Sequence, residues 1–462
     1  MTITDRRGHP TDAEQPTEAM RPLRILIMAG YLPWHGHGGG MLVSNLLKQL
    51  HQHHDVTVLA PVSPGEEERV AEVAERCTSL ITVPRVMGGS SHASRSSNAD
   101  FHRISWLRHQ WHRMPRPLRE SIYAVRRVPY HLRQYRRDPW PDEVQRCLQP
   151  SFRQALRWAL AKQRYDIVIA EWPEAAPYVN ELPQSAGRVY ESHELRSITY
   201  WRRLASAATP DEKLYWLTQW LKMKRLERFA MTSFDLVTAV STREAALLRR
   251  YGGRARVVAN PIGLDLTRWP RQDLQPRDPN TLIFLGRMSY TPNKDAVLFF
   301  LERIYPRIQA AQPDVRFLVI GGRPDEEILA WNGRDGVTVT GYVPDVRPYL
   351  EQGTVFVLPI RHGSGVKIKM LEAMAAGIPI VSTPEGCEGI EIEPGRHMEV
   401  ATNEAEFATA VVRLLRDPGR RASIAEKARQ VIWERYDSEK NVRELESLYW
   451  DIVRQRQQVN AP

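Results

Sequence analysis

Cysteine is scarce in this chain of 462 residues. The cysteines lie far apart, form no C-x-x-C pair and number three: Cys77, Cys147 and Cys387. An odd number of widely spaced cysteines predicts neither a disulfide framework nor a zinc site. We expect them to be small buried side chains.

Long apolar runs are missing as well. The first twenty residues, MTITDRRGHPTDAEQPTEAM, contain acids and prolines but no apolar core of a signal peptide. Residues 1–20 are therefore predicted to be a disordered leader. No later segment reaches the roughly 18 consecutive apolar residues of a spanning helix. The sequence thus predicts a soluble cytoplasmic protein.

Several catalytic motifs are also missing. The chain has no G-x-x-x-x-G-K-[ST] loop and no G-x-S-x-G elbow, which argues against a Walker-type nucleotidase and an α/β-hydrolase. It has no D-x-D and no cluster of histidine ligands. No metal site is therefore predicted and no cofactor is expected.

Positive charge, in contrast, is abundant, with a formal net charge of +10. Residues 95–137 contain eleven arginines against only Asp100 and Glu120 as acids, and tryptophans and tyrosines are interleaved with them. This mixture suits an anionic membrane surface or another polyanion. The alternative is a solvated helical insertion, over about residues 85–150, that covers its own domain. We do not expect nucleic acid as a partner.

The remaining pattern indicates two α/β domains. In the first, over residues 21–261, RILIMAG reads as a buried strand, MLVSNLLKQLHQ as a helix and DVTVLAPV as the next strand. Residues 262–280 are polar and rich in proline, which predicts a linker. The α/β pattern restarts over residues 281–430, and residues 431–462 read as a helical tail that returns to the first domain. Doubly wound sheets bind ligands at the carboxyl ends of their strands.

A glycine-rich loop follows the first strand. Gly36 and Gly38 supply G-x-G, but Met41 replaces the third glycine of the dinucleotide fingerprint, so nicotinamide dinucleotide binding is disfavoured. Gly39 and Gly40, at the start of a helix, still leave backbone N–H groups for a phosphate or a sugar hydroxyl. Alternatively, these glycines only make a tight turn.

The second domain carries the stronger signal. Arg287 follows a strand and Lys294 opens a helix, and such a pair can neutralise a diphosphate. In HGSGVKIKMLEAMAAG a helix is predicted from near Gly365, with Lys367 close to its positive end. Glu372 then lies about two turns in, where it can accept the hydroxyls of a ribose. The stretch fits a nucleoside diphosphate, although a glycine-capped amphipathic helix with a solvated Glu372 would give the same pattern.

These residues resemble a known family. GSGVKIKMLEAMAAGIPIVST, LGRMSYTPNKDAV, GYVPDV, FVLPIRHGSG and GHGGG are similar to motifs of the group 1 glycosyltransferases, the retaining GT-B enzymes of family 4. The resemblance spans about Arg24 to Tyr449. It implies two Rossmann-like domains that face each other across a cleft, a nucleotide-sugar donor in the second domain and an acceptor hydroxyl held mainly by the first.

The resemblance also implies roles for single residues. Glu372 would hold the donor ribose, and Arg287 and Lys294 the diphosphate. The backbone of Gly365 and Val366 would meet phosphate. The turn at Tyr342 and Val343 would line the nucleobase pocket, and His193 would lie near the transferred sugar. Such enzymes need no metal.

One position departs from the family pattern. A glutamate is usual eight residues before the one matched by Glu372, but this chain has Ser364 there. A shift of the match would bring His362 or Gly363 into that role. The turn from Glu385 to Glu391 could supply a carboxylate instead.

The predicted function is therefore a metal-independent, retaining sugar transfer in cell-surface polysaccharide or glycolipid biosynthesis, at the inner membrane surface. Two alternatives stay open: a nucleotide-sugar epimerase or phosphorylase of the same fold, and a polyanion- or membrane-binding protein that works through residues 95–137.

Overall fold

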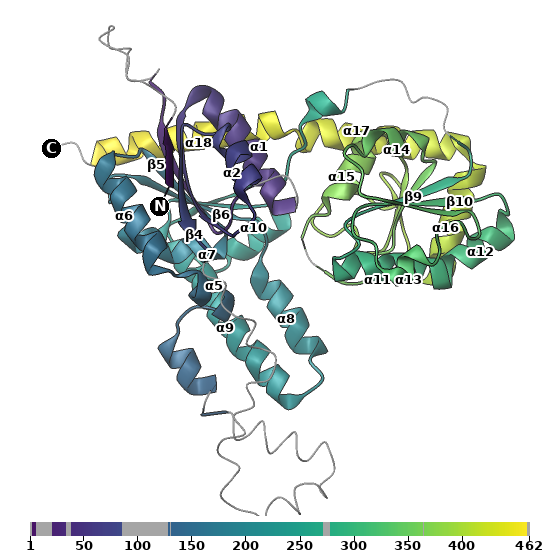
Figure 1. Cartoon of the computed structure of the whole chain (residues 1–462), viewed down its shortest axis with the longest axis horizontal. Helices are drawn as coiled ribbons and strands as arrows, with labels where there is room; N and C mark the ends of the chain where they lie inside the picture. Colours follow the sequence, from purple (N-terminus) through teal and green to yellow (C-terminus); the bar gives the residue numbers. More distant parts are fainter. Residues whose placement is uncertain are drawn as a thin grey trace, which may run out of the picture. The chain divides into compact units, whose positions relative to one another are not determined.

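The computed structural model describes residues 2–5, 21–33, 38–85, 128–129, 131–270, 278–363 and 365–459. The chain forms two compact units (Figure 1). The first comprises Met1–Ala259 with Ser447–Pro462, and the second comprises Asn260–Glu446. Each unit contains a largely parallel sheet with helices packed around it. The predicted pair of doubly wound α/β domains is confirmed.

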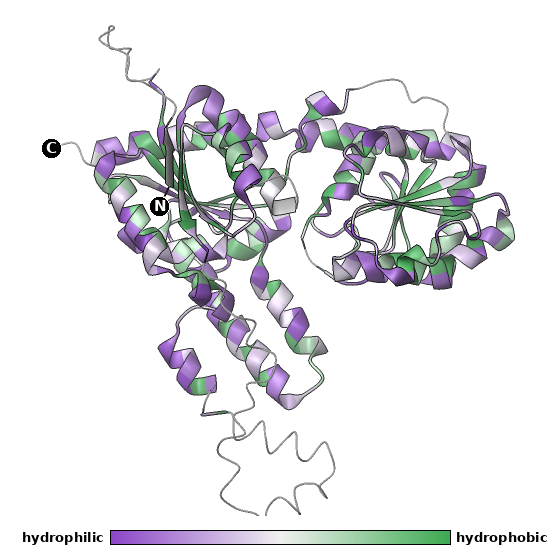
Figure 2. Cartoon of the chain, viewed as in Figure 1, coloured by the Kyte–Doolittle hydropathy of each residue, from purple (hydrophilic) through white to green (hydrophobic). Residues whose placement is uncertain are grey.

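The sheet of the first unit is built around β2. Its strands, in spatial order, are β1 (Thr2–Asp5), β4 (Ser79–Pro84), β3 (Asp55–Val62), β2 (Arg24–Ala29), β5 (Ile167–Glu171), β6 (Gly187–Ser192), β7 (Leu236–Ala239) and β8 (Arg256–Ala259). Every neighbouring pair except β1 and β4 is parallel. The central strands are apolar runs buried on both faces, as Figure 2 shows by their hydrophobic colouring. This is what helices on both faces of a parallel sheet require.

Strand β1 corrects the prediction of a disordered leader. Thr2–Asp5 pairs antiparallel with β4, with Thr2 opposite Thr82 and Asp5 opposite Ser79. The edge of β4 offers unpaired backbone groups, and a segment that alternates threonine and isoleucine suits a strand. Residues 6–20 of the predicted leader lie outside the described residues.

The helices of the first unit follow the sequence signals closely. They are α1 (Gly38–His53), α2 (Glu67–Ala74), α5 (Asp142–Cys147), α6 (Pro150–Lys162), α7 (Trp172–Ala175), the 3₁₀ turn η2 (Ala176–Glu181), α8 (Arg196–Ser206), α9 (Pro210–Ser233) and α10 (Thr242–Arg249). Ser241 caps α10, because its hydroxyl accepts a 3.2 Å hydrogen bond from the Glu244 amide. Gly252 ends the turn after α10 with φ of 65°, a conformation that favours glycine.

The sheet of the second unit has β9 at its centre. Its strands, in spatial order, are β11 (Val337–Gly341), β10 (Arg316–Ile320), β9 (Thr281–Leu285), β12 (Val355–Leu358), β13 (Ile380–Ser382) and β14 (Glu399–Val400). All these pairs are parallel. Chain order reverses direction between β9 and β12, and the carboxyl ends of strands at such a reversal are where doubly wound sheets bind ligands.

Helices cover both faces of this second sheet (Figure 1). The helical elements of this part of the chain are the 3₁₀ turn η3 (Leu266–Arg268), α11 (Thr291–Phe299), the π turn η4 (Phe300–Ile304), α12 (Tyr305–Ala311), α13 (Glu326–Leu329), α14 (Arg347–Gln352), α15 (Ile368–Ala375), α16 (Glu404–Arg416), α17 (Pro418–Arg435) and α18 (Ser438–Val459), the last of which runs on into the first unit. α11, η4 and α12 follow one another without a break as one helical stretch. The π turn interrupts it just before Pro306, which lacks the N–H that a regular turn needs.

The predicted linker is only partly correct. Residues 271–277 lie outside the described residues, but residues 262–270 belong to the second unit. The Leu264 amide donates to the Tyr436 carbonyl at 2.7 Å, and Ser438 donates back to Leu264 at 2.9 Å. Gly263 passes so close to Ser438 that a Cβ would clash with its backbone. The polar composition of this stretch hid its backbone pairing.

The last helix contributes to both units. Its end packs on the first unit, where Ile452 lies against Gly187 without room for a Cβ. Arg456 donates to Asp235 at 2.6 Å and to the Gln184 carbonyl at 2.7 Å. No helix among the described residues combines the length and the apolar character needed to cross a bilayer.

Candidate active site

The predicted donor residues gather at the carboxyl end of the second sheet. Arg287 lies two residues after β9, and the glycine-rich loop of residues 363–367 follows β12, the neighbouring strand. The two loops touch, because a Cβ on Gly363 would lie 3.9 Å from the Tyr290 hydroxyl and from Pro292. Sequence reasoning therefore placed both elements on the correct edge of the sheet.

The glycine-rich loop adopts conformations that need glycine. Gly363 has φ of 112° and Gly365 has φ of 75°, while Ser364 lies outside the described residues. Lys367 occupies the N-cap position of α15 without a capping bond from its side chain, and its ammonium donates to the Gly365 carbonyl at 2.7 Å. The predicted helix start near Gly365 is wrong, because α15 begins at Ile368. The positive φ of Gly365 cannot continue into a right-handed helix.

Because α15 starts later than predicted, Glu372 lies closer to the start of the helix than the sequence suggested. It is the fifth residue of α15, just over one turn in rather than two. Burial raises the pKa of Glu372 to about 7, and the nearby charges of Arg268 and Lys369 oppose that rise. A carboxyl group shielded from water in this way is suited to accept ligand hydroxyls.

Lys369 is the residue that sequence reasoning missed. Its ammonium donates to Asn293 Oδ1 at 2.6 Å and lies 4.5 Å from the centre of the Phe284 ring. A Cβ on Gly286 would lie 2.5 Å from the same nitrogen, so the backbone just before Arg287 passes over Lys369. Burial lowers the pKa of Lys369 to about 7.

The missed signal was present in the sequence. Lys369 and Glu372 stand three residues apart in KMLE, which places them on one face of a helix. Asn293 joins this face to the loop after β9, since its Nδ2 donates to the Arg287 carbonyl at 2.9 Å. The side-chain hydrogen bonds are tertiary contacts that the sequence does not reveal.

The two predicted phosphate-binding cations differ in their surroundings. Arg287 is exposed in the loop after β9. Lys294 on α11 is held by Asp325 at 2.5 Å and by Glu327 at 2.8 Å. These two hydrogen bonds raise the pKa of Lys294. Its positive charge is therefore already neutralised by acids of its own unit.

The residues predicted for the nucleobase follow β11. Tyr342 is 80% exposed and Val343 is half-buried. The Tyr342 backbone and Cβ lie against Gly322, which follows β10. Tyr342 and Val343 thus lie at the same edge of the sheet as Arg287, but they follow β11, which is separated from β9 by β10.

His193 lies in the first unit, directly after β6. Its Nε2 shares a hydrogen bond with Glu171 Oε2, and both side chains are buried. The ring stacks on Trp172 with 4.4 Å between ring centres and 24° between planes. The imidazole is therefore fixed in position by two residues at the end of β5.

Trp172 itself is strained. It has φ of 71°, which is rare for a bulky residue and costs about 1–3 kcal/mol. The Arg196 guanidinium lies 5.1 Å from the centre of its ring. Arg196 also binds Glu143 and Glu174 at 2.7 Å and Glu194 at 3.1 Å, and these acids raise its pKa. This network holds the strained turn in place.

Gly39 and Gly40 lie in the first turn of α1, after β2. The sequence predicts the helix from Met41 onward, but α1 begins at Gly38. The glycines therefore form the helix start itself. A helix start presents backbone N–H groups toward the carboxyl end of the sheet, which keeps an anion or hydroxyl role open.

Among the described residues no group of three or more histidine, cysteine, aspartate or glutamate side chains could hold a metal ion.

Of the arginine-rich residues 95–137, the structure describes residues 128–129 and 131–137. There Arg225 donates to the Tyr135 hydroxyl at 3.2 Å and stacks over its ring.

Comparison with known proteins identifies relatives for both units. Residues 36–268 match the family model described as Glycosyltransferase Family 4, and residues 279–417 match Glycosyl transferases group 1. A Klebsiella pneumoniae uncharacterized 44.6 kDa protein in the cps region is 22% identical over 63% of this chain and 76% of its own length. The phosphatidyl-myo-inositol mannosyltransferase of Mycobacterium leprae is 28% identical over 39% of this chain and 51% of its own.

Solved structures share the fold. Sucrose-phosphate synthase from Thermosynechococcus elongatus has a TM-score of 0.63 at 17% identity, covering 94% of this chain and 99% of its own. Anabaena HepE in complex with UDP and glucose has a TM-score of 0.61 at 13% identity, covering 93% and 100%. At such identities the likeness concerns the fold alone.

Proposed function

The chain belongs to the family 4 and group 1 glycosyltransferases, and we propose that it moves a sugar from a nucleotide-diphosphate sugar to an acceptor hydroxyl with retention of configuration. One observation carries the donor part of this proposal. The loop after β9, which carries Arg287, and helix α15 after β12, which carries Lys369 and Glu372, meet where the strand order reverses, and such a reversal is where these sheets bind ligands.

The donor would be held by charge and by backbone. Arg287 and the start of α15 would stabilise the negative charge that develops on the departing diphosphate, with the backbone of Gly365 and Val366 against the phosphates. Lys369 is added to the predicted pair, and Lys294 would act on phosphate once its bonds to Asp325 and Glu327 open. Glu372 would accept the ribose hydroxyls, and Tyr342 and Val343 would border the base.

The first unit would supply the acceptor side. His193, fixed by Glu171 and Trp172, would lie beside the transferred sugar and orient it against the acceptor hydroxyl. The proposal requires no protein nucleophile. Because cationic side chains and a helix start would balance the diphosphate, it also requires no metal, so activity should survive EDTA.

The acceptor class is proposed from the names of relatives. A putative colanic acid biosynthesis glycosyltransferase of Escherichia coli is 28% identical over 32% of this chain and 39% of its own length, and the mycobacterial relative acts on a phosphatidyl-inositol. We propose a cell-surface polysaccharide or a glycolipid as the product. A nucleotide-sugar epimerase or phosphorylase is less favoured, since these relatives are named as transferases.

A membrane-facing surface is proposed on helices α8 and α9. These helices pack side by side and extend away from the first sheet (Figure 1). Trp201 is 53% exposed, and Leu217 and Leu221 are exposed by more than a third. The same two helices carry exposed basic residues: Arg202, Arg203, Lys213, Arg225 and Arg228. Aromatic side chains among cations suit an anionic lipid surface at the cytoplasmic face of a membrane.

Vesicle binding tests this surface. Wild type should sediment with phosphatidylglycerol vesicles at low salt and much less at high salt, and Trp201→Glu should weaken that binding. The matched control is Leu329→Glu, which changes an exposed leucine of the second unit. Equal binding of both variants would contradict the assignment to α8 and α9.

The donor site is tested by thermal stabilisation with UDP, GDP, TDP and ADP and their common sugar conjugates. One nucleotide should raise the melting temperature of wild type, and Glu372→Ala should lose most of that rise. The exposed Glu302→Ala serves as control. If no nucleotide stabilises the wild type, the donor proposal fails.

A further inference from the structure

Two acidic side chains of the first sheet lie side by side next to His193. Glu171 on β5 and Glu191 on β6, together called the carboxyl pair, are partners in the parallel register, so their side chains leave the same face of the sheet. Glu171 is fully buried and Glu191 is 3% exposed. Two carboxyl groups so close together and so far from water do not both ionise near neutral pH. The carboxyl pair therefore holds one proton.

The hydrogen bonds of the two acids indicate which of them holds this proton. Glu171 Oε2 bonds to His193 Nε2, whose N–H compensates a negative charge, while Glu171 Oε1 is buried without a partner in the described part of the chain. The Glu191 side chain bonds to two hydroxyls, that of Thr238 and that of Tyr449 at 3.5 Å. A hydroxyl can accept from a protonated acid as well as donate. The charge thus belongs on Glu171 and the proton on Glu191.

The pKa of Glu191 agrees with this assignment. Burial and the charge of Glu171 raise that pKa to about 7, and the hydrogen bond from Thr238 opposes the rise. Tyr31, in the loop after β2, stays a neutral phenol, because burial and the charge of Glu171 raise its pKa as well. Glu191 therefore keeps its proton below about pH 7 and loses it above.

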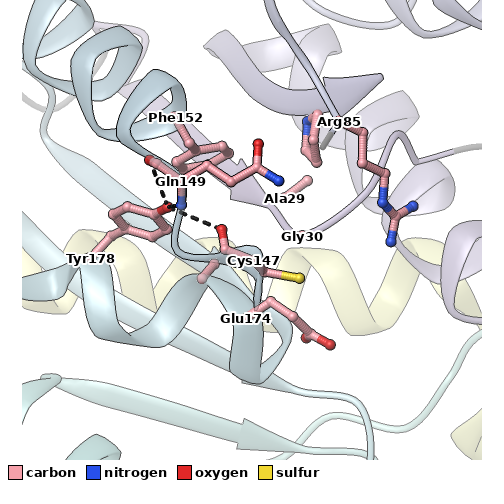
Figure 3. A pocket seen from close by; sticks show the side chains of 10 residues that line it. Ala29, Gly30, Arg85, Cys147, Gln149, Phe152, Glu174 and Tyr178 are labelled. Carbon is pink, nitrogen blue, oxygen red and sulfur yellow. Dashed lines mark hydrogen bonds between the residues drawn. The ribbon is translucent and has the colours of Figure 1, made fainter. Parts of the chain in front are cut away.

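The nearest charges outside the carboxyl pair are bound to one another. Arg196 binds Glu174 at 2.7 Å. Figure 3 shows Glu174 beside the Cys147 thiol, at a small pocket that has room for about one or two water molecules. The charge of Glu174 is thus compensated by Arg196, and the carboxyl pair sets the protonation of His193.

We propose that Glu191 is a positioning residue, whose proton limits the carboxyl pair to one negative charge and so holds the His193 ring neutral, with its Nε2–H on Glu171. The acid and the ring compete for one proton. Were Glu191 ionised as well, the second negative charge would favour that proton on the ring, which would then be cationic and donate from both nitrogens. With Glu191 protonated, His193 Nδ1 stays an acceptor.

The consequence for turnover rests on the proposed sugar transfer. In that proposal a sugar with its diphosphate lies beside His193, so a second buried negative charge would oppose the charge that develops on the leaving group. The turnover number at saturating donor should therefore be highest below about pH 7, where Glu191 is protonated, and fall at least about tenfold by pH 9.

Infrared difference spectra of the full chain between pH 6 and pH 9 test the proton without turnover. Wild type should lose a buried carboxylic acid C=O band with a midpoint near pH 7, and Glu191→Gln should lack that component. The exposed Glu302→Gln should keep it. Thr238→Val should move the midpoint to higher pH, because it removes a hydrogen bond that lowers the pKa of Glu191. The matched control is Thr232→Val, at an exposed threonine of α9.

Nitrogen-15 NMR of the histidine side chains tests the state of the ring. The His193 signals are identified by their loss in His193→Gln. At pH 7 they should show a neutral ring protonated at Nε2, both in wild type and in Glu191→Gln. Glu171→Gln, which removes the charge that holds the Nε2–H, should lose this preference.

Turnover as a function of pH then tests the role of the proton. Glu191→Gln is neutral at every pH and should abolish the fall above pH 7, and Thr238→Val should shift that fall to higher pH. An unchanged fall in Glu191→Gln, a shift to lower pH in Thr238→Val or a cationic His193 ring at pH 7 would overturn the proposal. If neither nucleotide binding nor sugar transfer is found, the proposed function fails, whereas the infrared band and the ring signals still decide where the proton lies.

Discussion

Lys369 Nζ donates a 2.6 Å hydrogen bond to Asn293 Oδ1 and so joins α15 to α11. Asn293 Nδ2 in turn donates to the Arg287 carbonyl at 2.9 Å, which links α11 to the loop after β9. The ammonium is therefore held at the candidate diphosphate site in a position where burial lowers its pKa to about 7.

The first prediction concerns proton uptake on donor binding. A diphosphate favours the charged form of Lys369, so above about pH 7 binding should take up a proton and affinity should fall. Glu372 opposes this, because its own pKa of about 7 makes it a better acceptor as pH rises. Calorimetry in buffers of different ionisation enthalpy measures the uptake. Lys369→Arg, which keeps its charge, should abolish it; an unchanged uptake would remove Lys369 from the site.

The second prediction separates the cations kinetically. Arg287→Ala should lower kcat/KM by about 10²–10³ if it stabilises the leaving diphosphate. Lys294→Ala should cost less than about tenfold, because Asp325 and Glu327 already neutralise that lysine. Steady-state kinetics checks both, with the exposed Arg334→Ala as control. A larger loss for Lys294 than for Arg287 would reverse their roles.

The third prediction is structural. Arg196→Ala leaves Glu143, Glu174 and Glu194 without their shared cation and should destabilise the first unit by about 3–5 kcal/mol. Denaturant unfolding measures the loss. Arg157→Ala, which removes one exposed partner of Glu181, should cost below about 1 kcal/mol. Similar losses for both variants would show that the buried network adds nothing.

The fourth prediction concerns pH and stability. Burial and the charge of Glu171 raise the pKa of Glu191 to about 7. A raised carboxyl pKa means that the folded state holds a proton that the unfolded state releases, so this contribution to stability is lost as pH rises from about 4.5 to about 7. At pH 8, Glu191→Gln should therefore melt at a higher temperature than wild type, with a free energy of unfolding larger by an amount on the order of 1–3 kcal/mol. At pH 4 the gain should be small. Glu302→Gln, at an exposed site, should show no such gain; a lower melting temperature for Glu191→Gln at pH 8 would contradict the argument.

The sequence predicted the strands well because buried parallel strands are simple apolar runs. RILIMA and DVTVLAPV each form the strand expected of them. The start of α15 was misplaced because only the backbone angle of Gly365 shows that the helix cannot begin there. Likewise, the strand at Thr2–Asp5 exists through its partner β4, which lies far away in the chain.

The candidate site was predicted in part for a related reason. Arg287, Gly365 and Glu372 are recognisable because glycine and charge stand at strand ends and helix starts. The ion pairs of Lys294 and the hydrogen bonds of Lys369 depend on side chains from other elements. The hydrogen bond between Glu171 and His193 likewise depends on two different strands, β5 and β6. Such tertiary contacts leave no local pattern to read.

The two-part contribution of α18 has a practical consequence for dissecting the protein. The first unit is not a contiguous stretch of the gene, since Ser447–Pro462 completes it. A fragment that stops at Ala259 would uncover Gly187 and leave Asp235 without Arg456. Domain swapping between relatives, or separate expression of this half, should therefore carry the final sixteen residues along, joined through a circular permutation or a short spacer.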